Sequence, residues 1–98
     1  MTTLENERPE TRGFRVVGRV QGVGFRWWTR GVAEELGLAG SVRNLPDGSV
    51  EVRARGGLDE LAALEARLGQ GPRFSRVDRV ERFEVDVIES DTEFRIAL

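Results

Sequence analysis

The sequence predicts an α+β fold with two layers, in which two helices pack on a mainly antiparallel sheet. Three observations lead to this prediction. The chain has 98 residues, which suffices for one domain with a single core. Its apolar residues change repeatedly between the two-residue period of strands and the spacing of helices. Pro46, Asp47 and Gly48 stand between two alternating segments and mark a hairpin.

The first half of the domain reads as a strand, a helix and a hairpin. Apolar residues alternate over residues 13–20, as in a half-buried strand. Over residues 25–36 the apolar positions follow a helical stripe, and glycines come directly after it. Residues 41–45 and 49–55 alternate again, so we expect them to be the paired strands of the hairpin.

The second half adds a helix and two more strands. Residues 58–69 carry leucines at helical spacing and end on a glycine. Residues 76–88 alternate, and 94–98 form a short last strand. The predicted order is βαββαβ with an extra C-terminal strand, which is a split-βαβ, ferredoxin-like sandwich. We expect residues 1–12 to be a flexible tail and 13–98 to be the domain.

The composition excludes several kinds of chemistry. The chain has no Cys, His or Tyr, and all fifteen of its basic residues are Arg. Disulfides, thiol nucleophiles, imidazole bases and Schiff-base lysines are therefore excluded, together with the commonest transition-metal ligands. Composition does not exclude a Mg²⁺ or Ca²⁺ site made of carboxylates alone, but no calcium-loop pattern occurs. We expect no metal and no cofactor.

The charge and hydropathy patterns bear on partners and location. A net charge of −2 argues against nucleic-acid binding, because such binders usually carry excess positive charge. No apolar run is long enough to span a membrane, and the N-terminus has no apolar segment of a signal peptide. The expected protein is a cytoplasmic monomer that binds neither nucleic acid nor membrane, and any anion site must be local.

The stretch GRVQGVGFR at residues 18–26 lies between the first strand and the first helix. A helix N-terminus exposes unpaired N–H groups, and glycines before it let these groups surround an anion. The guanidinium of Arg26 adds a planar fork that matches phosphate oxygens. The stretch predicts a phosphate site, although a simple turn with a solvated arginine has the same pattern. It matches neither the dinucleotide fingerprint nor the P-loop.

Together with the later segment GLAGSVRNLPDGSVEV, this stretch resembles the acylphosphatases over roughly residues 13–98. The resemblance implies hydrolysis of small acyl phosphates to a carboxylate and inorganic phosphate, without a metal or cofactor. It implies that Arg26 binds the phosphate, that Asn44 holds the attacking water and that Thr29 supports the site. It also implies main-chain phosphate donors in a loop formed by Gln21, Gly22, Val23, Gly24 and Phe25.

The chain departs from the usual family pattern at a few positions. Ser41 stands where many relatives have Trp, and Trp27 and Trp28 follow Arg26 where other residues are often found. Tryptophans can form a base-stacking platform, but these two start a helix, so we expect one to face the core and one the rim of the pocket. The alternative function is a non-catalytic module that binds phosphate or carbamoyl phosphate.

Overall fold

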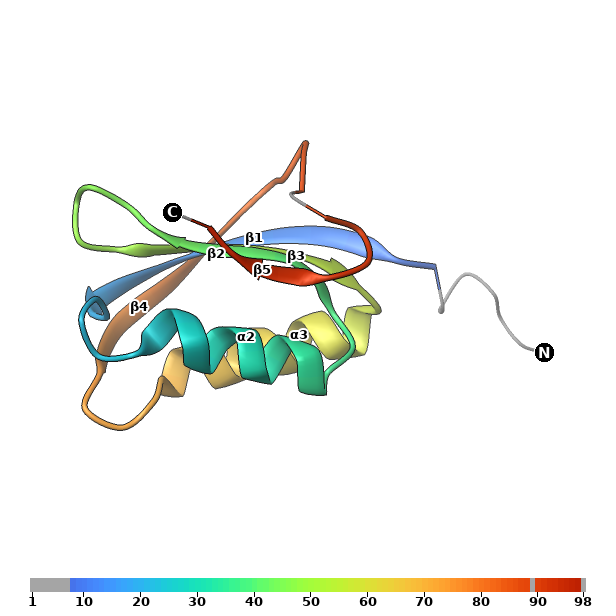
Figure 1. The fold of residues 1–98 in the computed structure, drawn as a ribbon. Helices are drawn as coiled ribbons and strands as arrows, with labels where there is room; N and C mark the ends of the chain where they lie inside the picture. Colours follow the sequence, from blue (N-terminus) through green and yellow to red (C-terminus); the bar gives the residue numbers. More distant parts are fainter. Residues whose placement is uncertain (1–7, 89, 98) are drawn as a thin grey trace.

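Two helices pack on one face of a five-stranded sheet within residues 8–88 and 90–97, which are those that this computed structural model describes (Figure 1). Their order confirms the predicted ferredoxin-like βαββαβ arrangement with an added C-terminal strand. The elements are β1 (Glu10–Arg19), α2 (Phe25–Glu35), β2 (Ala39–Asn44), β3 (Val50–Gly56), α3 (Leu58–Gln70), β4 (Arg76–Phe83) and β5 (Phe94–Ile96).

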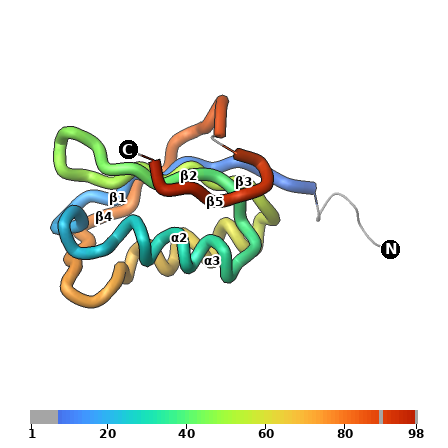
Figure 2. The backbone as a smooth tube through the Cα atoms, viewed as in Figure 1, coloured from blue at the N-terminus to red at the C-terminus, as the bar shows by residue number. Residues whose placement is uncertain are grey.

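The sheet has the strand order β4-β1-β3-β2-β5. All neighbours are antiparallel except β5, which runs parallel to β2. Because β4 and β5 lie at opposite edges, the chain between them must cross the sheet. Arg53 Nη1, on β3, donates a hydrogen bond to the carbonyl oxygen of Val87 at 3.0 Å. Figure 2 shows this connection on the side of the sheet away from the helices.

The core lies between the helices and the inner face of the sheet. Alternate residues of β1 and β3 point into it, and α3 contributes leucines at helical spacing. These periods are the ones that predicted the elements. The large side chains that are exposed by 2 % or less are Phe14, Val16, Val20, Phe25, Val42, Val50, Val52, Leu61, Leu64, Leu68 and Phe94.

The first strand starts earlier than the predicted domain boundary at residue 13. Glu10 pairs with Gly56, and the pairing of β1 with β3 continues without interruption to Val16. Residues 10–12 are therefore part of the sheet and not of a tail, because β3 offers them main-chain partners. Residues 1–7 of the predicted tail lie outside the described residues.

The prediction of a strand over residues 76–88 was too long, since β4 ends at Phe83. Phe83 pairs with Gly13, and its ring occupies the place where a Cβ on Gly13 would lie. After Phe83 the chain leaves the sheet edge to cross toward β5. The alternation of apolar and polar residues in the sequence continues beyond the end of β4, although these residues are no longer in the sheet. Val87, for example, is exposed. The final strand is shorter than predicted and ends at Ile96.

Candidate phosphate-binding site

The loop between β1 and α2 has the backbone that an anion cradle needs. Gly22 and Gly24 have φ values of 76° and 78°, in the left-handed region that favours glycine. Gly24 caps α2 without a side-chain hydrogen bond, and its carbonyl oxygen accepts from Trp28 N at 3.0 Å. The preceding N–H groups of the first helical turn therefore have no partner within the helix.

The side chain of Gln21 fastens this loop to the β2–β3 hairpin. Its Nε2 donates to the carbonyl oxygens of Leu45 and Ser49, at 2.8 Å and 2.9 Å. Leu45 directly follows Asn44, the last residue of β2. The loop and the end of β2, which are far apart in sequence, therefore lie beside each other. The sequence predicts only a main-chain role for Gln21, so this side-chain contact is an addition from the structure.

The hairpin turn is closed by its own hydrogen bonds. Leu45 N donates to the carbonyl oxygen of Ser49 at 2.8 Å, and Gly48 N donates to that of Leu45 at 3.1 Å. Asp47 Oδ1 accepts from Ser49 N at 2.9 Å and also from Ser49 Oγ. The predicted Asp-Gly turn thus fixes the two carbonyl oxygens that accept hydrogen bonds from Gln21 Nε2.

A charged contact on the outer face of the sheet holds the same turn. Arg15 of β1 donates to Asp47 and, at 2.9 Å, to Glu81 of β4. The hydrogen bond from Ser49 Oγ and the one from Arg15 both favour the carboxylate, so the pKa of Asp47 lies well below its ordinary value. Hydrogen bonds from Arg79 and Arg15 likewise lower the pKa of Glu81.

Two buried polar atoms, one at the end of β2 and one on α2, lack hydrogen-bond partners within the described residues. Asn44 Oδ1 and Thr29 Oγ1 are buried and make no hydrogen bond within the residues described. Thr29, on α2, is fully buried. The strand alternation places Asn44 on the same face as the buried Val42, which is the face that packs on α2. Leaving a buried polar atom unpaired costs about 1–3 kcal/mol, so such an atom is normally satisfied by a water molecule or a bound ligand.

Arg26 lies in the first turn of α2, directly after the loop, and is half-buried. It takes part in none of the ion pairs found within residues 8–88 and 90–97. By contrast, Arg30, one turn further along, pairs with Glu34 at 3.1 Å. A guanidinium beside unpaired helix N–H groups can bind a dianionic ligand, because all of these groups donate hydrogen bonds.

The two tryptophans have different environments. Trp28 packs against the core, with its ring 5.4 Å from that of Phe25 at an interplanar angle of 61°. Trp27 is 68 % exposed, and the guanidinium of Arg30 lies 5.7 Å from its ring. One tryptophan therefore faces the core, as expected, and the other faces outward. Ser41 is buried.

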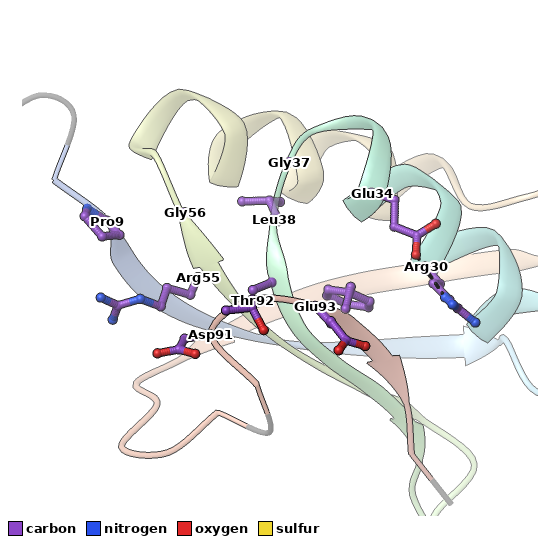
Figure 3. A pocket seen from close by; sticks show the side chains of 12 residues that line it. Pro9, Arg30, Glu34, Gly37, Leu38, Arg55, Gly56, Asp91, Thr92 and Glu93 are labelled. Carbon is purple, nitrogen blue, oxygen red and sulfur yellow. Dashed lines mark hydrogen bonds and ion pairs between the residues drawn. The ribbon is translucent and has the colours of Figure 1, made fainter.

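Two cavities border α2, and residues 21–24 of the loop line neither of them; the larger one lies beside the C-terminal half of the helix. One of about 490 Å³ is bordered by α2, by Arg55 of β3 and by the chain before β5 (Figure 3). The loop itself is open, since Gly22 and Gly24 are exposed. In the described part of the chain, no three His, Cys, Asp or Glu side chains group as a metal site requires. No helix described there is long and apolar enough to cross a membrane.

Comparison with known proteins gives the family. The family model Acylphosphatase matches residues 12–96. An acylphosphatase of Koribacter versatilis is 57% identical over 75 residues, which are 76% of this chain and 68% of that protein. The acylphosphatase structure from Coxiella burnetii superposes with a TM-score of 0.85 at 39% identity, over 99% of this chain and 100% of that one.

The fold also occurs inside a larger protein. The structure of HypF from T. kodakarensis matches with a TM-score of 0.78 and 32% identity, over 89% of this chain but 12% of that chain. The family model, the sequence relatives and the solved structures agree. The chain belongs to the acylphosphatase family, and it is a hydrolase that acts on acyl phosphates. The predicted resemblance is confirmed, whereas the roles of individual residues stay predictions.

Proposed function

We propose that this chain hydrolyses acyl phosphates without a metal ion, by attack of water on a phosphoryl group held between its loop and Arg26. The observation that carries the proposal is the hydrogen bonding of Gln21 to the hairpin, which brings the left-handed glycine loop next to Asn44. All the proposed site residues come from one chain, so a monomer suffices.

In this proposal the phosphate binds at the start of α2. The main-chain N–H groups of the loop from Gln21 to Phe25 donate to its oxygens, and the guanidinium of Arg26 makes two parallel hydrogen bonds. Phosphoryl transfer passes through a loose transition state, so the protein contributes mainly positioning and charge stabilisation. Fixed N–H dipoles and one arginine supply both without a Lewis acid.

The leaving group explains why no general acid is required. It is a carboxylate whose conjugate acid has a pKa of about 4, so it departs without a proton at neutral pH. The absence of His and Cys from the chain is therefore compatible with the reaction. A non-bridging phosphate oxygen can take the proton of the water, since its own second pKa is about 6.

Asn44 is the residue proposed to hold the water. Its Oδ1 is buried and unpartnered in the described structure, which supports a role as acceptor for a water O–H. The buried Thr29 Oγ1 supports the site from the α2 side, where the same ligand or a second water can satisfy it. Water and leaving group then lie on opposite sides of the phosphorus, as in-line displacement requires.

A second function is favoured by the likeness to HypF, in which the matching region is a small part of a longer chain. A domain of this kind can bind phosphate or carbamoyl phosphate without turnover. The test is release of phosphate from acetyl phosphate and carbamoyl phosphate in the presence of EDTA. We expect turnover of acetyl phosphate that EDTA leaves unchanged. Binding without turnover would favour the module, and loss of activity with EDTA would contradict the metal-free mechanism.

A further inference from the structure

A groove between α2 and β5 lies next to the candidate site. It encloses about 430 Å³. It shares Arg30, Glu93 and Phe94 with the larger cavity that Figure 3 shows from close by. Its lining residues are Trp27, Arg30, Glu93, Phe94, Arg95 and Ile96.

The groove begins at the end of α2 that carries Arg26. Arg26 and Arg30 are four residues apart in the helix, so they share a face, and Arg30 lines the groove. On the strand side, Ile96 pairs with Val42 in parallel register. Asn44 therefore lies just beyond Ile96, at the same end. Trp27, which directly follows Arg26, lines this groove but not the larger cavity. A group attached to a phosphate between Arg26 and Asn44 can therefore extend into the groove.

Half of the groove's lining residues are apolar, and its two arginines are paired with carboxylates. Arg30 pairs with Glu34 at 3.1 Å, and Arg95 pairs with Glu93 at 3.9 Å. Both guanidiniums that line it therefore already face carboxylates. Trp27, in contrast, exposes 68 % of its surface. An indole that is so exposed at the mouth of a groove is suited to stacking on a planar apolar group.

We propose that this groove binds the acyl group of the substrate and that Trp27 makes the enzyme prefer aromatic acyl phosphates over acetyl phosphate. The proposal rests on the proposed function, because it extends the same site. The aromatic ring of such a substrate lies only a few bonds from the phosphorus. It can therefore contact Trp27, which directly follows Arg26, while the phosphate stays at the loop.

The test compares benzoyl phosphate with acetyl phosphate. The ratio of their kcat/KM values should fall roughly 3- to 10-fold in Trp27→Ala, which is the range expected from one lost aromatic contact. Trp27→Phe should keep most of the preference because it retains a ring. The matched control is Phe74→Ala, since Phe74 is 77 % exposed and does not line the groove. This control should leave the ratio unchanged.

A ratio that stays within twofold of the wild type in Trp27→Ala would overturn the proposal, and so would an equal fall in Phe74→Ala. Neither result would affect the proposed hydrolysis, which wild-type turnover of acetyl phosphate tests separately. Circular dichroism of each variant verifies that it folds. Because Trp27 is so exposed, we expect its replacement to leave the core intact.

A binding measurement locates the acyl group without turnover. The probe is the analogue of benzoyl phosphate in which CH₂ replaces the bridging oxygen, titrated into ¹⁵N-labelled wild-type protein. We expect NMR shift changes at the main-chain amides of residues 21–26 together with the indole N–H of Trp27 and the amide of Ile96. Changes at the loop alone would refute the subsite and leave the phosphate site standing. Changes at neither place would contradict both proposals.

Discussion

At the scale of single residues, the sequence identifies some side chains of the proposed phosphate site and misses the contacts of others. Arg26 and Asn44 stand in motifs with characteristic neighbours, so the sequence alone nominates them. Gln21 differs, because its side chain binds carbonyl oxygens of Leu45 and Ser49, 24 and 28 residues away. No local pattern predicts a contact at that separation, since it depends on how the hairpin folds back onto the loop.

Asn44→Ala tests the residue proposed to hold the water. We expect kcat to fall by roughly 10²–10³, which is the usual cost of losing one preorganised group in the transition state. Steady-state kinetics with acetyl phosphate measure this effect. A change confined to KM would mean that Asn44 only binds substrate. Thermal unfolding should show a folded variant.

Gln21→Ala tests whether the loop must be fastened to the hairpin. Loss of its two hydrogen bonds should lower the free energy of unfolding by about 2 kcal/mol, at about 1 kcal/mol for each bond. It should also lower kcat/KM, because the loop and Asn44 are no longer held together. Urea unfolding and kinetics measure the two effects. Gln70→Ala, at an exposed position on α3, is the control and should change neither.

At the scale of elements, the β2–β3 hairpin depends on Asp47. The carboxylate accepts from Ser49 within the turn and from Arg15 on β1, and these bonds lower its pKa. Because the folded pKa lies below the unfolded value of 3.8, the carboxylate stabilises the fold fully above that value. This contribution is lost as the pH falls toward the folded pKa.

Asp47→Asn should therefore be less stable than the wild type at neutral pH, and the difference should shrink below about pH 4. Urea unfolding midpoints between pH 7 and pH 3 measure it. Asp86→Asn, which removes one exposed carboxylate from the connection after β4, corrects for the general effect of charge. A difference that stayed constant down to pH 3 would show that Asp47 does not stabilise the turn through its charge.

At the scale of the whole molecule, the element order followed from the sequence, and the strand ends did not. The spacing of apolar residues predicted both helices, and the turn residues Pro46, Asp47 and Gly48 predicted the hairpin. The end of β4 is set instead by the sheet, since the chain must leave one edge after Phe83 to reach β5 at the other. The contact of Arg15 with Glu81 joins residues 66 apart, so it too was beyond any local pattern.

The fold as a whole holds the loop, the hairpin and α2 next to one another, and Arg26 is the cation that we propose binds the phosphate. Hydrolysis should therefore depend on Arg26 and not on the net charge of the protein. The most direct test is hydrolysis of acetyl phosphate by Arg26→Ala in the presence of EDTA. Arg67→Ala, on α3, makes the same change in net charge and is the control. We predict that Arg26→Ala loses activity by about 10³-fold or more while remaining folded, and that Arg67→Ala stays active. Activity of Arg26→Ala within tenfold of the wild type would contradict the account.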